Sequence, residues 1–275
     1  LVTPAKMKAT FAQWIDDTPY VLTILPNEKY GISDAGVDRS DGVPYPTEKV
    51  SFKFPELQTA TLSNGAKVVL AQRSGVPLVE LNFQFNFGYA QENNDELGYT
   101  NFMMDMLNEG TKKYSSLQFD EELDSLGSNL GFSSGLDTSY VTVSSLKANL
   151  SDTLDLAKEA LIFPTFPQKE IDRIKKQTLA AIIQEENRPA AIAYRNIGKL
   201  LYGEDHPYGK PLTGSGISTT ISDISRENII ALHQRAINPA NLTFAVAGDI
   251  ELNKLVNVLE DKFGNWAGNK SSNLK

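Results

Sequence analysis

The alternation of apolar and polar residues is clearest between positions 81 and 87. Every second side chain there is apolar, which is the period of a β-strand with one buried face. The inward side chains are Leu81, Phe83, Phe85 and Phe87. Upstream, Asn64-Gly65 separates β-type runs at 59–62 and 67–71, and this dipeptide between two such runs predicts a hairpin. We therefore expect a sheet with one face toward a core.

Longer blocks of helical periodicity separate these strands from two more, at 138–147 and 241–249. Helices are predicted at 96–108, 115–126, 152–161, 168–186, 189–202 and 251–263. In the helix at 168–186 the inward residues are Ile171, Ile174, Leu179, Ile182 and Ile183. After a Gly-rich loop at 203–216, we expect Ser222 to cap a further helix. Because the strands are not separated by single helices, the order favours the α+β class, with a two-layer, mostly antiparallel sheet packed on helices.

Residues 1–54 contain many prolines and turn residues and are predicted to be a connector. Within them, the apolar run at 20–25 predicts a strand that Pro26 ends. We expect one α+β domain at 55–267 and a linker toward a following domain at 268–275. The chain starts at Leu1 without an initiator Met or a charged signal region, so we expect a processed or excised start.

The composition excludes several classes of function. The 275 residues carry a formal net charge of −8, which offers little attraction to nucleic acid or anionic lipid. No apolar run reaches about 18 residues, so membrane insertion is not expected. The chain has no cysteine, which excludes disulfides, thiolate nucleophiles and cysteine zinc sites. Serine-hydrolase, dinucleotide and P-loop motifs are missing, and structural roles are predicted for the two histidines, His206 and His233.

The most informative segment is 98–111, which reads GYTNFMMDMLNEGT. It resembles the metal-site segment of the M16 zinc peptidases, the insulinase and mitochondrial-processing-peptidase family. Their pattern is roughly G-x-x-H-F-x-E-H-M-x-x-x-G-T, with an inverted H-x-x-E-H zinc motif. The frame of the pattern is present as Gly98, Phe102, Met106, Gly110 and Thr111.

The chemical groups of that motif are substituted. Asn101 stands at the position of the first histidine, Met104 at that of the catalytic glutamate and Asp105 at that of the second histidine. The resemblance places the third zinc ligand near Ala181. If the alignment slips, the equivalent is Gln184, Glu185 or Glu186. A single carboxylate without imidazole or thiolate is a poor zinc site, and a thioether cannot take a proton from water, so we expect no metal and no catalytic residue in this chain.

The resemblance extends over most of 55–265. The loop at 206–211 resembles the family's H-P-x-G loop, and 241–249 resembles its strand ending in Gly-Asp. The family's substrate-side N-A-x-T segment is replaced here by Gly131, Phe132, Ser133 and Ser134, which makes them a possible substrate-side segment. The resemblance implies the LuxS/MPP-like metallohydrolase fold.

M16 proteins resemble a clam shell of two halves, of which one half holds zinc and the other often does not. The resemblance implies that this chain is the first domain of the zinc-less C-terminal half of a bacterial M16 protein. Its expected partners are a peptide substrate and a catalytic half, in the same polypeptide or in a separate subunit, and zinc is expected only in that half. The strand at 20–25 would then end the preceding half. An exported, periplasmic location is favoured by the resemblance alone.

Two alternatives remain open at this stage. One is an active metal-dependent peptidase with atypical ligands, such as Asp105, His206 and either Glu185 or Glu186. The other is a free-standing module that binds peptides or proteins. The first requires those side chains to converge in the folded chain.

Overall fold

The computed structural model describes residues 2–15, 21–23 and 55–268. The chain divides into two compact units, Leu1–Phe52 and Lys53–Lys275. The first unit contains the helix α1 (Pro4–Trp14), which was not predicted, and Thr3 caps it by accepting a hydrogen bond from the Lys6 amide. Most of the strand predicted at 20–25 lies outside the described residues, and the three that are described form no strand.

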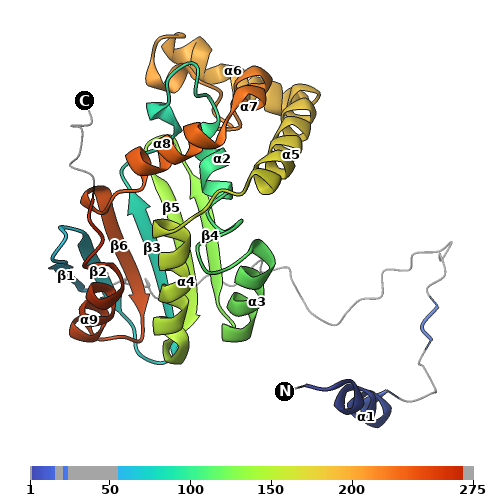
Figure 1. Ribbon diagram of the computed structural model, residues 1–275, viewed down its shortest axis with the longest axis vertical. Helices are drawn as coiled ribbons and strands as arrows, with labels where there is room; N and C mark the ends of the chain where they lie inside the picture. The colour runs from blue at the N-terminus through green and yellow to red at the C-terminus, as the bar shows by residue number, and fades with distance from the viewer. Residues whose placement is uncertain (1, 16–20, 24–54, 269–275) are drawn as a thin grey trace, which may run out of the picture. The chain divides into compact units, whose positions relative to one another are not determined.

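The second unit is built on a six-stranded sheet in the order β1-β2-β6-β3-β5-β4 (Figure 1). The strands are β1 (Leu57–Thr61), β2 (Lys67–Gln72), β3 (Leu78–Phe85), β4 (Asn129–Ser134), β5 (Ser139–Leu146) and β6 (Leu242–Gly248). Only the β2–β6 pair among these neighbours is parallel, and β1 and β2 form the predicted hairpin. The predicted class, a mostly antiparallel α+β fold, is therefore confirmed.

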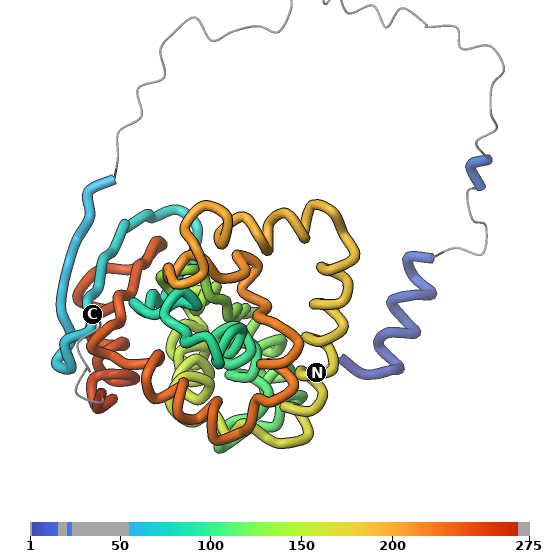
Figure 2. Tube along the Cα trace, turned by 90° about the horizontal axis from the view of Figure 1, so that it is seen from above, coloured from blue at the N-terminus to red at the C-terminus, as the bar shows by residue number. Residues whose placement is uncertain are grey.

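Apart from α3, which contacts α4 and β4, the helices of this unit form two groups. Their bounds are α2 (Tyr99–Asp105), α3 (Ser116–Leu126), α4 (Leu150–Ile162), α5 (Gln168–Glu186), α6 (Pro189–Tyr202), α7 (Ser218–Asp223), α8 (Arg226–Ala236) and α9 (Leu252–Phe263). Helices α4 and α9 cover one face of the sheet, whereas α2 and α5–α8 gather beyond one end of the strands (Figure 1). Seen from above, α5 and α8 lie around α2, which contacts both (Figure 2). Within the described part of the chain, no helix has the length and apolar character needed to cross a membrane.

The core lies between the sheet and the helices α4 and α9 and continues among α2, α5, α7 and α8. All four residues predicted to point inward from 81–87 are buried. Phe83 makes edge-to-face contacts with Phe244 of β6, at 4.7 Å between ring centroids, and with Phe263 of α9, at 5.6 Å. The opposite face carries polar side chains such as Gln84 and Thr142, which are partly or fully exposed. The alternation in the sequence therefore corresponds to a covered face and an open face.

Two predictions about local structure were wrong, and one strand was missed. The missed strand, β4, has only two apolar residues, Leu130 and Phe132, with a glycine between them, so its alternation is too short to indicate a strand clearly. Ser222 does not cap a helix; it lies in α7, and Ser225 caps α8 instead, in a capping box with Asn228 that satisfies two backbone amides. Ile183 of α5 was expected to point inward but is 58% exposed.

Candidate functional site

A pocket of about 440 Å³ lies where α2, α5 and β4 meet the loop around Thr213. It is lined by Gly98, Asn101, Phe102, Asp105, Phe132, Ser133, Ser134, Ile174, Gln177, Thr178, Ala181, Thr213 and Ser215. Most positions singled out in the sequence therefore meet in one place, although they are up to 80 residues apart. Met104 is instead fully buried in the core, and the pocket lining does not include Gly131, Gln184, Glu185, Glu186 or His206.

The buried carboxylate of Glu92 fixes the start of α2. It accepts hydrogen bonds from the backbone amides of Gly98, at 2.9 Å, and Thr100, at 2.6 Å. These amides belong to the first turn of the helix, where a negative charge is favourable. Burial raises the pKa of Glu92 to about 7, even though the two backbone bonds and the nearby Lys210 ammonium act to lower it. Glu92 thus orients the helix that carries Asn101 and Asp105.

Asn101 and Asp105 lie one helical turn apart and both line the pocket. Among the described residues, neither side chain has a hydrogen-bond or ion-pair partner. Partial burial, together with the charge of Glu109, raises the pKa of Asp105 to about 6. The loop that contains Gly214 lies so close to Asn101 that a Cβ atom at position 214 would collide with the Asn101 amide nitrogen. Gly214 also has a φ of +69°, which favours glycine.

Helix α5 forms the wall facing α2. It contributes Ala181 to the pocket, together with Ile174, Gln177 and Thr178, whereas Gln184, Glu185 and Glu186 do not line it. One turn before Gln177, Arg173 forms ion pairs with Glu109 and Glu170 and so connects α5 to the segment after α2. The position predicted for the third zinc ligand therefore faces the pocket with a methyl group.

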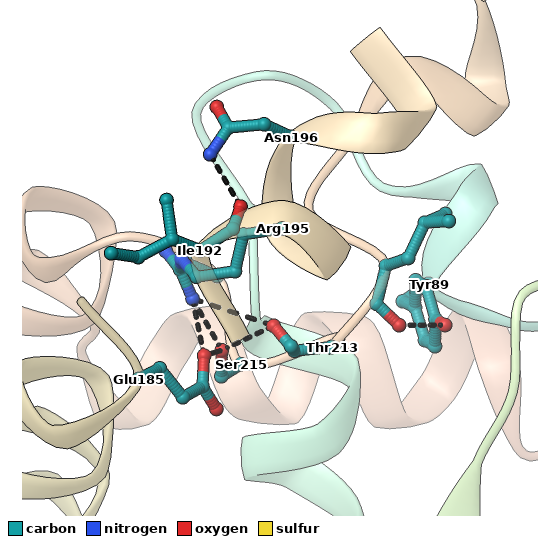
Figure 3. A network of polar contacts seen from close by, with 9 residues as sticks. Tyr89, Glu185, Ile192, Arg195, Asn196, Thr213 and Ser215 are labelled. Atoms are coloured by element: carbon teal, nitrogen blue, oxygen red, sulfur yellow. Dashed lines mark hydrogen bonds and ion pairs between the residues drawn. The ribbon is translucent and has the colours of Figure 1, made fainter. Parts of the chain in front are cut away.

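A buried arginine holds the rim of the pocket (Figure 3). Arg195 of α6 donates to Glu185 of α5 at 2.6 Å, to Ser215 Oγ at 2.7 Å and to the Gly216 carbonyl at 2.7 Å. Two helices and the loop that carries Thr213 and Ser215 are thus connected through one guanidinium. The sequence analysis missed both Arg195 and Glu92. The signal for Arg195 was available, because it is the only charged residue between positions 189 and 198.

The residues around the pocket do not fit a zinc ion. They offer one carboxylate, from Asp105, and neutral amides and hydroxyls, and zinc sites in proteins are built from imidazole, thiolate and several carboxylate ligands. No three His, Cys, Asp or Glu side chains within the described ranges are grouped so that they could hold a metal ion. Met104 has 0% exposure, so its thioether does not reach the pocket.

The atypical ligand set is not brought together either. Glu185 is paired with Arg195, and Glu186 does not line the pocket. His206 accepts a hydrogen bond from the Tyr208 amide at 3.0 Å and stacks on Tyr202. The other histidine, His233, bonds the Leu161 carbonyl, and burial lowers its pKa to about 4. Both histidines make structural contacts within the fold.

The strand β4 borders the pocket and, within the described part of the chain, pairs with one sheet neighbour only, β5. Phe132, Ser133 and Ser134, which were predicted to be substrate-side residues, are its last three residues and line the pocket. An edge strand presents unpaired backbone amides and carbonyls on its free side. The geometry thus places a free strand edge next to a partly polar pocket.

The chain is similar in sequence and fold to known proteins. The family model described as Insulinase (Peptidase family M16) matches residues 67–215, and that described as Peptidase M16 inactive domain matches 223–275. An uncharacterized zinc protease of Rickettsia felis is 26% identical over 213 residues, covering 78% of this chain and 51% of the relative. The non-peptidase homolog YmxG of Helicobacter pylori is 23% identical over 216 residues, covering 76% of this chain and 49% of the relative.

Among solved structures, a peptidase M16 inactive domain from Pseudomonas fluorescens superposes with a TM-score of 0.71 and 27% identity. The match covers 75% of this chain and 50% of that structure. The chain therefore spans about half the length of these relatives.

Proposed function

The chain belongs to the insulinase family, peptidase family M16, and on that basis we propose that it is a non-catalytic domain that binds peptide and assembles with a zinc-containing half. The observation that carries this proposal is the pocket between α2, β4 and α5, where the family frame persists without metal ligands or a catalytic base. We further propose that zinc belongs only to the partner half.

Peptide binding is supported by the edge of β4. A peptide in extended conformation can add to the free side of this strand through main-chain hydrogen bonds, which require no metal. Its side chains would then alternate between the pocket side and the solvent side. Ser133 and Ser134 place hydroxyl groups beside that path, and Phe132 adds apolar surface.

Assembly with a second half is supported by the unusual surface of α6. The side of this helix that faces the protein carries Arg195 and Gly198, whereas Leu200 is 81% exposed and Leu201 is 68% exposed. A surface helix normally has the reverse arrangement, with its apolar side inward. Contiguous exposed apolar side chains are typical of protein–protein contact sites. The match to only half of each relative is consistent with a missing partner for this face.

Peptide binding along β4 can be tested without altering the protein. A library of unstructured ten-residue peptides is screened against the full chain by fluorescence polarisation, and the best binder is then resynthesised with N-methyl groups at alternate residues. N-methylation removes the amide donor. If the peptide adds as a strand, methylation of one alternate set of residues abolishes binding and methylation of the other set is tolerated. Equal loss for both sets, or no binder in the library, contradicts the proposal.

The absence of zinc from this chain has a separate test. The chain is expressed in zinc-containing medium, dialysed and analysed for metal by mass spectrometry. We expect no stoichiometric zinc and no hydrolysis of the bound peptides by the chain alone. One tightly retained zinc per chain would contradict the proposal.

A further inference from the structure

We propose that the pocket between α2, α5 and β4 binds a primary ammonium group at the end of an aliphatic stem, as in a lysine side chain of the bound peptide. The identity of the ligand as a peptide side chain rests on the proposed peptide binding. The ammonium specificity rests on the residues of the pocket themselves.

The charges around the pocket favour a cation. Asp105 contributes a carboxylate that has no partner among the described residues. The guanidinium of Arg173, on the facing helix, is already paired with Glu109 and Glu170 and so does not neutralise it. The second acid, Glu109, adds repulsion to Asp105. A cation that enters the pocket therefore relieves an uncompensated negative charge, and an anion is repelled.

The shape of the lining favours a primary amine on a hydrocarbon stem. Apolar surface comes from Phe102, Phe132 and Ile174, against which methylene groups can pack. The acceptors are the Asp105 carboxylate, the amide oxygen of Asn101 and the hydroxyl of Thr178. An ammonium group has three hydrogens in a tetrahedral arrangement and can donate to three separate acceptors. A guanidinium is planar and pairs best with a single carboxylate in bidentate geometry, so it is less suited than an ammonium to three acceptors on separate residues.

A small amine tests the pocket without any peptide. The isotopically labelled full chain is titrated with n-pentylammonium and, as a neutral control of similar size, with 1-pentanol, and backbone amide shifts are followed by NMR. We expect saturable shifts at Asn101, Asp105 and Thr178 with the amine only. Asp105→Asn should lower the affinity for the amine by about tenfold or more, which is the contribution of a charge-assisted hydrogen bond. Asp120→Asn removes the same charge from an exposed position that does not line the pocket, and it should leave the affinity for the amine unchanged.

Equal shifts with the alcohol, or equal amine affinity in the Asp105→Asn variant, would overturn the inference. This readout is independent of peptide binding along β4. If the amine binds but no peptide does, the proposed function fails and the ammonium pocket remains.

Variants of a bound peptide identify the side chain that enters the pocket. In a library binder that contains lysine, replacement of that lysine by norleucine should weaken binding about tenfold in the natural protein and leave it unchanged in Asp105→Asn. Replacement by arginine should weaken binding as well. Full retention of affinity with norleucine, or equal affinity for the arginine peptide, would refute a lysine-specific pocket.

Discussion

Replacing Met104 with glutamate tests whether the position of the family's catalytic base has become part of the core. The Met104 side chain is 0% exposed and belongs to the main hydrophobic cluster. A carboxyl group at this depth remains protonated at pH 7, which costs about 4 kcal/mol relative to its ordinary pKa near 4.3. The lost apolar burial adds about 2 kcal/mol. Since whole domains are stable by only about 5–15 kcal/mol, the Met104→Glu variant should be either largely unfolded or only marginally stable at pH 7.

The sign of the pH dependence follows from the same burial. The folded variant keeps its proton in the range where the unfolded chain releases it, so the penalty grows by about 1.4 kcal/mol per pH unit above about pH 4.3. Urea unfolding of the full chain at pH 5 and pH 7, followed by circular dichroism, measures this difference. Met104→Leu preserves apolar volume and should cost less than about 1.5 kcal/mol at both pH values. A penalty below about 1 kcal/mol for Met104→Glu at pH 7 would mean that residue 104 reaches solvent, and would refute the reasoning.

Three further predictions concern the surroundings of the pocket. Because burial raises the pKa of Glu92 to about 7, the folded state keeps a proton that the unfolded chain releases between about pH 4.5 and 7. The free energy of unfolding should therefore fall by about 3 kcal/mol as the pH rises through this range. Glu92→Gln should flatten this part of the profile of stability against pH, measured by urea unfolding, and an unchanged profile would contradict the prediction. Arg195→Met removes the charged donor shared by Glu185 and Ser215 and leaves the Glu185 carboxylate with the Ser215 hydroxyl as its donor. The variant should cost about 3 kcal/mol in urea unfolding, and a loss under about 1 kcal/mol would contradict a stabilising role for the network. Leu200→Arg, at an 81% exposed site, should leave the unfolding midpoint unchanged but prevent co-sedimentation with the proposed catalytic half, and undiminished assembly would exclude α6 from the proposed interface.

Much of the fold could be predicted from local sequence, because strand and helix periods are imposed by the backbone at short range. The alternation at 81–87 predicted β3, and the helix predicted at 168–186 has the bounds of α5. Local signals failed where the pattern was weak. The alternation in β4 rests on only Leu130 and Phe132, which is too short to indicate a strand clearly. Both Ser222 and Ser225 are residues of a type that caps helices, and the contacts around α8 select Ser225.

The candidate site was only partly accessible from the sequence. The spacing in 98–111 identified Asn101 and Asp105 as a substituted metal motif, and residue types alone argued against zinc. The sequence could not show that Met104 turns into the core while its neighbours on α2 face a pocket. It also could not show that Arg195 holds the rim, because an ion pair between two helices depends on how they pack.

The sequence by itself therefore determined most strands and helices of the domain, the covered face of the sheet and the loss of imidazole and catalytic carboxylate from the motif. Within the described residues, tertiary structure decided that β6 inserts between β2 and β3, that β4 ends the sheet, and that α2, α5 and β4 border a pocket lined by Asp105, which has no partner there. The physical reason is the range of the interactions. Secondary structure depends on neighbours within a few residues, whereas strand order and pocket composition depend on the summed packing of segments far apart in the chain.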